Sequence, residues 1–469
     1  MINFLLCFAL LITLLSSALP FKLALALGNE TDRLALLALK DELLLGGSGI
    51  DISRNSISGS VPNNLGNLKN LRLLNIEVNQ LGSGKEGDVE FFSSLRNCSM
   101  LSVLSMHMNN LGGVFPDSVA NLSAQLYELR MGFNQITGSI TQGISNLVNL
   151  YLMSLSENFL VGEIPSSIGK LQSLEGLWLY SNFLTGEIPS TIGNLTRLYA
   201  LSLHTNNFTG GIPPTLQNCQ NMRTLSFSDN KLSSPIPNQV FGAFPSLIIL
   251  DLSYNSLTGA LPSDFTTSKN LIELTINDNN FFGEIPMIQS LEIEVLKMQG
   301  NSFQGTIPQS FGSLRSLKFV DLSSNNLSGI IPPQLEKLPL LVSLNLSFNQ
   351  LDGEVPKEGV FKNVSGFSFM GNRQLCGGIS ELGLPKCSNK EAKGKGKVLS
   401  TKIIIAMVIS IFFAFLLAVT IVFLSWRRKS KRAFLPVALF ESSGDRMRIK
   451  DAIIELHATK ARLVLDWDL

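Results

Sequence analysis

Leucine and isoleucine recur along residues 46–370 in a fixed order with asparagine, glycine and proline. The common unit reads LxxLxLxxNxLxGxIPxxLGNLxx, and most units are 24 residues long. Its asparagine recurs at Asn55, Asn79, Asn109, Asn134, Asn158, Asn182, Asn206, Asn230, Asn255, Asn279, Asn301, Asn325 and Asn349. Self-similarity at a fixed period of this size is typical of a solenoid, in which each unit forms one coil that buries its apolar face against its neighbours.

The spacings within a unit predict its local structure. The leucines of LxxLxL point inward from a short strand, and the strands of successive coils pair into a parallel sheet on the concave side. The recurring asparagine, here named the ladder asparagine, turns inward where the chain leaves the strand and satisfies backbone groups there. Glycine and proline then shape the convex return. The predicted fold is therefore an α/β solenoid, curved around a parallel concave sheet.

Two apolar runs flank the coils. Residues 1–26 predict a signal peptide, because their apolar run ends in the A-x-A pattern of Ala24-Leu25-Ala26. No Lys or Arg precedes Lys22, so an uncleaved anchor is the alternative. Residues 403–424 carry no charge, and at about 1.5 Å per residue they cover roughly 33 Å, enough for a bilayer core. We therefore predict one transmembrane helix at 403–426.

The orientation in the membrane follows from the signal peptide. Basic residues lie on both sides of the span, in a linker at 391–402 and directly after it, so the positive-inside rule does not decide. The signal peptide places the N-terminal part outside a plasma membrane that the chain crosses once. Eight N-x-S/T sequons precede the span and predict glycosylation at Asn29, Asn97, Asn121, Asn194, Asn207, Asn326, Asn345 and Asn363.

Composition adds little chemistry. The 469 residues are 45% hydrophobic and 16% charged, and the net charge of +1 gives no basis for a nucleic-acid partner. The three histidines are far apart, and no Cys/His spacing suggests a metal. Residues 82–89, GSGKEGDV, fit a kinase glycine-rich loop, but no V-A-I-K, H-R-D or D-F-G follows. We interpret them as an ordinary flexible loop and expect no catalytic residue, metal or cofactor.

The repeat itself resembles the plant-type leucine-rich repeats of plant receptor kinases. One step of 30 residues holds LGSGKEGDVEFFSSLRNCSML, which is similar to the same place in the immune-receptor subfamily. NETDRLALLALK resembles the helix that opens the family's N-terminal cap, but the Cys-Trp…Cys segment is missing, so residues 27–45 form a partial cap. The implied fold is a leucine-rich-repeat solenoid plus one transmembrane helix.

The resemblance extends to both ends of the membrane span. GNRQLCGGISELGLPKCS resembles the family's C-terminal cap at 371–390 and implies a disulfide between Cys376 and Cys387, whereas Cys98 and Cys219 are expected to be buried free thiols. The tail at 427–469 resembles the last helix of a serine/threonine kinase and is too short for a kinase domain. It implies a remnant without activity. An unrelated amphipathic helix is the alternative.

A recognition surface is the remaining candidate site. Residues four, two and one before each ladder asparagine should project from the concave sheet, and we select Arg130, Phe133, Glu157, Trp178, Tyr180, His204, Asp229 and Tyr254. Trp178, Tyr180 and His204 form the centre, with the make-up of an interface hot spot. The alternative is that any solenoid exposes a few aromatic residues there.

The resemblance implies a single-pass receptor-like protein that binds an extracellular peptide or protein in plant defence. It also implies a co-receptor kinase that carries leucine-rich repeats. Lacking its own kinase, the protein would signal through that partner or act as a decoy. Two other functions are open: a secreted-type leucine-rich-repeat inhibitor or structural protein, and a non-functional truncated receptor-kinase product.

Overall fold

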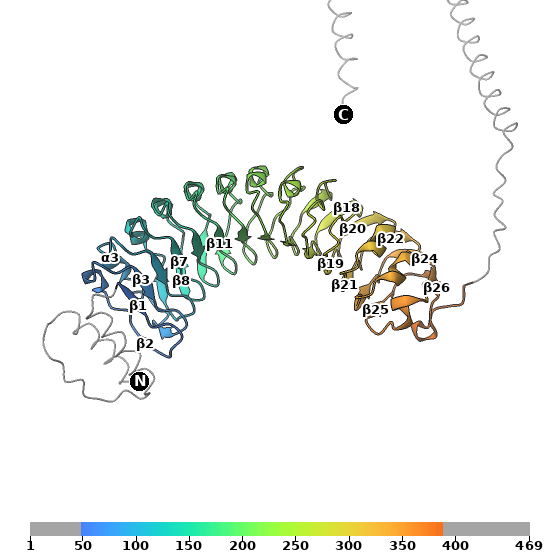
Figure 1. Cartoon of the computed structure of the whole chain (residues 1–469), viewed down its shortest axis with the longest axis horizontal. Coiled ribbons are helices and arrows are strands. Elements are labelled where there is room, and N and C mark those ends of the chain that lie inside the picture. The colour runs from blue at the N-terminus through green and yellow to red at the C-terminus, as the bar shows by residue number, and fades with distance from the viewer. Residues whose placement is uncertain (1–47, 388–469) are drawn as a thin grey trace, which may run out of the picture. The chain divides into compact units, whose positions relative to one another are not determined.

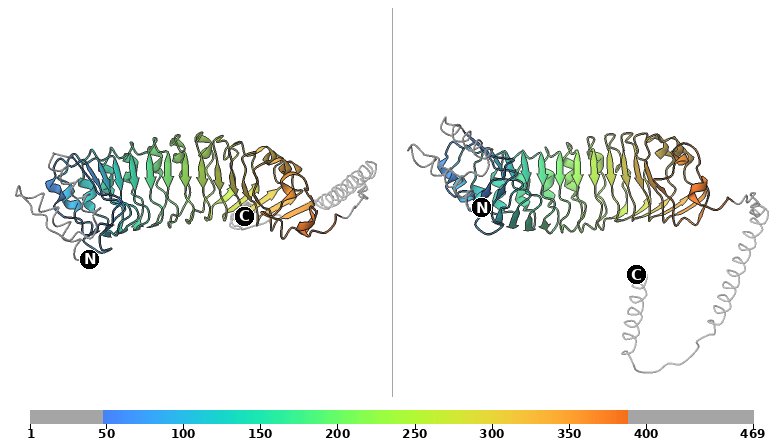
Figure 2. Two further views of the ribbon diagram at one scale, coloured as in Figure 1. Left: turned by 60° about the horizontal axis from the view of Figure 1, so that its bottom comes forward. Right: turned by 90° about the horizontal axis from the view of Figure 1, so that it is seen from below.

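The computed structural model describes residues 48–387, which form a curved row of coils (Figure 1). Each coil adds one short strand to a continuous parallel sheet, and the strands stand side by side in sequence order (Figure 2). The fourteen strands of this sheet are β1 (Gly49–Asp51), β3 (Leu73–Asn75), β5 (Val103–Ser105), β7 (Glu128–Arg130), β9 (Leu152–Ser154), β11 (Gly176–Trp178), β13 (Ala200–Ser202), β14 (Thr224–Ser226), β15 (Ile249–Asp251), β17 (Glu273–Thr275), β19 (Val295–Lys297), β21 (Phe319–Asp321), β23 (Ser343–Asn345) and β25 (Phe367–Ser368). The predicted parallel-sheet solenoid is confirmed.

Smaller parallel sheets follow the ladder asparagines on one side of the coils. One pairs β2 (Ser58–Gly59) with β4 (Gln80–Leu81). A second holds β6 (Gly112–Val114), β8 (Gln135–Gly138), β10 (Phe159–Gly162) and β12 (Phe183–Leu184). A third holds β16 (Thr258–Ala260), β18 (Asn280–Glu284), β20 (Ser302–Gly305), β22 (Asn326–Gly329), β24 (Gln350–Val355) and β26 (Gln374–Gly377). Residues that point outward from these strands lie on the flank of the solenoid, because the strands belong to sheets separate from the concave sheet.

Short helices form the convex return. Several begin directly after a proline whose fixed φ suits entry into a turn, as Pro165 does before η4. The helices are η1 (Leu65–Asn67), α3 (Phe92–Leu95), η2 (Asp117–Asn121), η3 (Gln142–Asn146), η4 (Ser166–Lys170), η5 (Ser190–Asn194), η6 (Pro214–Asn218), η7 (Phe241–Ala243), η8 (Gln309–Ser313), η9 (Pro333–Lys337), η10 (Gly359–Lys362) and η11 (Ser380–Leu382). Paired strands stand only about 4.7–4.9 Å apart, and the helices on the opposite side need more room, so the row curves with the sheet on its inner, concave side (Figure 1).

The strands pair in register, so equivalent leucines stack from coil to coil. Leu177 of β11 lies opposite Met153 of β9 and Leu201 of β13, and all three side chains are fully buried. One apolar core therefore runs through all the described coils. No coil has a second apolar layer of its own, so each depends on its neighbours for stability.

The ladder asparagines hold the turns at the end of the concave strands. Asn182 donates from Nδ2 to the carbonyls of Leu155 and Leu179, both at 3.1 Å, and its Oδ1 accepts the Leu160 N–H at 3.0 Å. The same pattern repeats along the row. It includes Asn372, which donates to the Leu346 carbonyl at 2.9 Å and which the sequence pattern missed.

The C-terminal end of the described solenoid is closed by a disulfide between Cys376 and Cys387. Cys98 and Cys219 are buried and unpaired, as expected. Burial raises the pKa of the Cys219 thiol to about 11, so this group stays protonated and behaves as an apolar core residue.

The remaining expectations concern segments outside residues 48–387. The signal peptide, the partial N-terminal cap with Asn29, the basic linker, the transmembrane helix and the kinase-like tail lie there. Within the described residues, no helix has the length and apolar character that crossing a bilayer requires.

Candidate ligand-binding site on the concave sheet

The concave sheet places the predicted site residues at two kinds of position. Arg130 and Trp178 end strands β7 and β11, and Tyr180 and His204 follow just beyond their strands. The other four occupy the residue before a ladder asparagine, where φ is positive: Phe133 (54°), Glu157 (53°), Asp229 (52°) and Tyr254 (51°). A side chain in this left-handed conformation costs about 1–2 kcal/mol, and the asparagine bonds hold it there.

Four aromatic rings form a row along the concave sheet, with one coil that contributes no ring to it between the second and the third. The rings of Tyr180 and His204 stack with centroids 4.4 Å apart and an interplanar angle of 13°. Phe133 meets Tyr180 edge to face at 6.5 Å, and His107 meets Phe133 at 4.9 Å. Both are geometries that aromatic rings prefer. Phe133 reaches across an intervening coil because that coil carries only Ser156 at the place of Tyr180.

A hollow of about 290 Å³ lies beside this row. It is lined by His107, Arg130, Leu152, Ser154, Trp178 and Tyr180. The Trp178 indole folds back over Gly176 of the same strand, where an added Cβ would come within 2.2 Å of the ring. Arg130 forms an ion pair with Glu128 at one edge. The hollow thus combines half-buried aromatic walls with an ion pair at one edge.

The two histidines of the row are predominantly neutral at pH 7. Burial lowers the pKa of His204, and the carboxylates of Asp251, Glu157 and Asp229 oppose this shift only in part. Burial also lowers the pKa of His107. The row therefore presents uncharged rings that can stack and exchange hydrogen bonds with a ligand.

The structure brings together only part of the predicted set. Arg130, Phe133, Trp178, Tyr180 and His204 belong to the row or to its hollow. Glu157 and Asp229 act on His204 through their charge, and Tyr254 is exposed two coils beyond His204.

The selected set leaves out three residues of the hollow, His107, Ser154 and Leu152. His107 lies two residues before Asn109 and Ser154 four residues before Asn158, so the same positional rule covers both. Leu152 begins β9 at an outward position that this rule did not include.

The glycine-rich loop at 82–89 is held by its own aspartate. The buried Asp88 carboxylate accepts the backbone N–H groups of Ser83 at 2.7 Å, Gly112 at 3.0 Å and Lys85 at 3.2 Å. These three hydrogen bonds anchor the loop backbone to the aspartate side chain, and the flexibility of the loop stays a prediction. A bound phosphate would need the same backbone N–H groups as hydrogen-bond donors, and they already donate to the Asp88 carboxylate.

The sequons that the structure describes lie on several faces. Asn97, Asn121, Asn194, Asn326 and Asn363 are exposed and Asn207 is half-buried. Asn345 differs, because it ends β23 on the concave sheet and donates to Asp321 at 3.0 Å. Glycosylation at these positions stays a prediction. Among residues 48–387, no three His, Cys, Asp or Glu side chains gather closely enough to hold a metal ion.

This geometry defines a class of protein: a leucine-rich-repeat solenoid with a row of aromatic residues on its concave sheet. Residues 128–377 match the family described as "Leucine-rich repeat region", and residues 49–68 match "Leucine Rich Repeat". The first match covers more than half of the 469 residues. The chain belongs to the leucine-rich-repeat family.

The relatives that the chain matches include plant receptor kinases. Receptor kinase-like protein Xa21 of rice (Oryza sativa subsp. japonica) is 42% identical over 90 residues, which are 19% of this chain and 9% of Xa21. The aligned segment thus spans less than a tenth of that relative's length.

Two solved structures share the solenoid. The plant peptide hormone receptor RGFR1, in complex with RGF2, is 32% identical with a TM-score of 0.61, over 66% of this chain and 48% of that chain. The Arabidopsis receptor kinase HAESA, in complex with the peptide hormone IDA and the co-receptor SERK1, is 26% identical with a TM-score of 0.56, over 72% and 64%.

Proposed function

We propose that this chain is a receptor-like protein whose concave sheet binds an extracellular peptide or protein. The observation that carries the proposal is the aromatic row from His107 to His204 with the hollow beside it. Rigid, half-buried rings that project from a fixed sheet lose little conformational entropy on binding, which is why such residues dominate interface hot spots.

The solved relatives support a peptide as the ligand. RGFR1 and HAESA are both solenoids of this family that were solved with a peptide hormone. In our chain the row crosses several coils in sequence order, so an extended peptide lying along it can contact one ring after another. Trp178 and Tyr180, which share one coil, are the residues with the largest expected contribution.

The membrane arrangement is part of the same proposal. Residues 1–26 direct the chain outward, 403–426 cross the plasma membrane once, and 427–469 form a cytoplasmic tail. The concave sheet then faces the extracellular space, where a defence role would place its ligand. We further propose that the tail transfers no phosphate, which predicts no incorporation when the purified full-length chain is incubated with radiolabelled ATP; labelled protein would contradict this.

A co-receptor kinase completes the proposed function. HAESA was solved together with the co-receptor SERK1, which supports a partner of this kind. In our chain, Phe348 and Met370 are 60% and 68% exposed near the C-terminal end of the concave sheet. These neighbouring apolar side chains offer a surface for a second protein, because large exposed apolar groups mark interaction sites when they gather.

A binding experiment tests the proposed site. The full-length chain in lipid nanodiscs is titrated with a panel of synthetic secreted-type peptides, and any peptide that binds is retested on variants. Trp178→Ala and Tyr180→Ala should each weaken binding by roughly 30-fold, the effect of a hot spot worth about 2 kcal/mol.

Phe183→Ala is the matched control. Phe183 is an exposed aromatic residue of the same coil, but it lies in β12 on the flank. This variant should bind within about twofold of the wild type. A bound peptide that is indifferent to Trp178 and Tyr180 would refute the site.

A further inference from the structure

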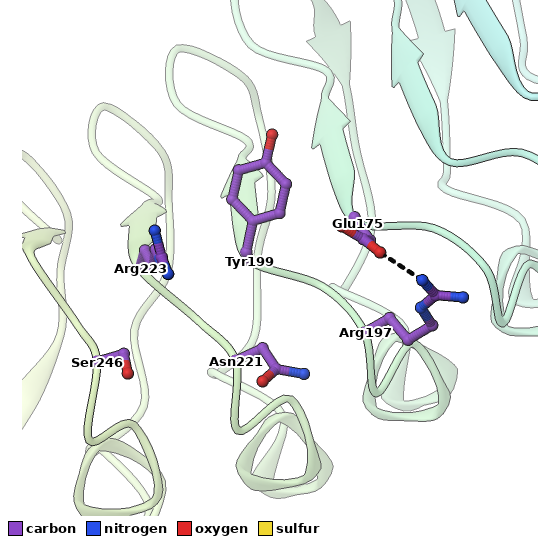
Figure 3. Close-up of a pocket in the computed structure, with 6 residues that line it drawn as sticks. All are labelled: Glu175, Arg197, Tyr199, Asn221, Arg223 and Ser246. Atoms are coloured by element: carbon purple, nitrogen blue, oxygen red, sulfur yellow. Dashed lines mark hydrogen bonds and ion pairs between the residues drawn. The ribbon is translucent and has the colours of Figure 1, made fainter.

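A second hollow lies at the rim of the concave sheet. It has a volume of about 540 Å³ and is lined by Glu175, Arg197, Tyr199, Asn221, Arg223 and Ser246. Figure 3 shows Tyr199 between the Glu175–Arg197 pair and Arg223, with Asn221 and Ser246 on the loops that lead into the next strands. The lining residues recur at two fixed places in the repeat, seven and nine residues before a ladder asparagine.

The hollow carries one positive charge that its own residues do not neutralise. Arg197 pairs with Glu175 at 2.6 Å. Arg223 is exposed, and no carboxylate of residues 48–387 lies within ion-pair distance of it. Two guanidinium groups therefore face one carboxylate.

At the same repeat position in a later coil, the positive charge is neutralised by an ion pair. Lys318 occupies the repeat position of Arg223, and it pairs with Glu294 of the preceding coil at 2.6 Å. The coil before Arg223 supplies Tyr199 at this position, so the phenol replaces the acid. Arg223 therefore lacks the carboxylate partner that Lys318 has at the equivalent position.

The neighbouring groups suit an anion. Burial, followed by the nearby Tyr151 and Glu175, raises the pKa of Tyr199, so its phenol adds no negative charge beside Arg223. The Ser246 hydroxyl has no hydrogen-bond partner among the described residues and is an available donor. Arginine binds carboxylate, sulfate or phosphate through two parallel N–H groups, which fixes the orientation of the anion.

We propose that this rim hollow is an anion subsite that binds an acidic side chain of the peptide ligand, with Arg223 as its principal contact. The inference rests on the proposed function. Glu175 and Tyr199 belong to the coils that carry Trp178 with Tyr180 and His204, respectively. A peptide bound to the aromatic row can therefore reach the hollow by continuing across the same coils toward the rim.

Arginine footprinting tests the subsite with defined probes. The full-length chain in nanodiscs is treated with phenylglyoxal, and modification of each arginine is followed by mass spectrometry. N-acetyl-aspartic acid amide is added at constant ionic strength, with N-acetyl-asparagine amide as the neutral control. We expect the acid to slow the modification of Arg223 at least threefold and the neutral probe to have no effect.

Arg315 is the matched internal reference, because it is exposed and forms no ion pair within residues 48–387 but does not line the hollow. Equal slowing at Arg223 and Arg315, or none at either, would overturn the subsite. Protection by galacturonic acid alone would overturn the peptide assignment in favour of an acidic polysaccharide. Arg223→Gln tests the ligand directly: an acidic peptide should bind at least fivefold more weakly, and its amide analogue should be unaffected.

The outcomes separate this subsite from the proposed function. If Trp178→Ala abolishes peptide binding while no anion protects Arg223, the concave site stands and the subsite fails. If anions protect Arg223 but no peptide depends on Trp178, the proposed concave site fails.

Discussion

The two halves of the concave sheet share one backbone but carry different side chains. In the N-terminal half, the projecting residues include the rings of His107, Phe133, Trp178, Tyr180 and His204. In the C-terminal half many are small hydroxyl and carboxyl groups that bond to one another, although Tyr254, Phe348 and Met370 are also exposed there. The Asp251 carboxylate accepts the hydroxyls of Ser253 at 2.6 Å and Thr275 at 2.8 Å.

Asp321 repeats this arrangement two coils beyond the Thr275 strand. It accepts the Ser323 hydroxyl at 2.6 Å and the Asn345 amide at 3.0 Å. These acids are therefore occupied by hydrogen bonds within the sheet. The difference teaches that the inward positions and ladder asparagines determine the fold, whereas the outward positions are free to determine binding.

The largest expected effect tests whether the two halves share one core. Leu177 of β11 and Leu274 of β17 are the central residues of their strands, and both are fully buried. Replacing either with alanine removes packed methyl groups and leaves a cavity, so each should lower the free energy of unfolding by about 3 kcal/mol. Urea unfolding followed by circular dichroism measures this. A loss confined to one half would contradict a continuous core.

The next effect concerns the ladder. Asn182 and Asn279 each donate to three carbonyls and accept one N–H, and both are buried. Alanine at either position leaves buried backbone groups without partners, at a cost of about 1–3 kcal/mol. We expect similar shifts of the urea midpoint for both variants. If either variant is as stable as the wild type, the asparagine does not hold the turn.

The repeat predicted the solenoid well because the same local positions determine every coil. Asn372 escaped the pattern because its coil carries phenylalanine at both inward places, Phe367 and Phe369, where every other coil has leucine or isoleucine at one or both. The site was harder to predict. The positional rule found which rings project, but the contact between Phe133 and Tyr180 depends on the small Ser156 between them. The hydrogen bonds from the glycine-rich loop to Asp88 depend on the orientation of that side chain, which a sequence motif does not predict.

A smaller effect separates binding from stability within the N-terminal half. A Cβ on Gly176 would lie 2.2 Å from the Trp178 ring, so Gly176→Ala should displace the indole while leaving the strand paired. Peptide affinity should fall about tenfold, because part of a hot-spot contact is lost. Titration of the peptide measures it.

Thr224→Ala at the equivalent strand position of β14 should leave affinity unchanged. Unchanged affinity for the Gly176 variant would instead show that the ligand does not touch Trp178.

The smallest effect is a pH dependence. Burial lowers the pKa of His204 below 6.5, so the unfolded chain takes up the proton first on acidification. Stability should therefore fall as the pH drops from about 6.5 to the lowered pKa, and should then level off. His204→Gln should reduce this slope when urea midpoints are compared at pH 7 and pH 5. A slope that is unchanged in the variant would assign the titration to another group.

Hydrogen–deuterium exchange of the full-length chain with its bound peptide compares the two halves most directly. The account predicts that the peptide slows backbone exchange from β5 to the turn after β13, which are the coils of His107 to His204. Exchange from β15 to β21 should stay unchanged. Slowing concentrated in β15 to β21, or along the flank strands alone, would contradict the claim that the aromatic half of the concave sheet is the binding surface.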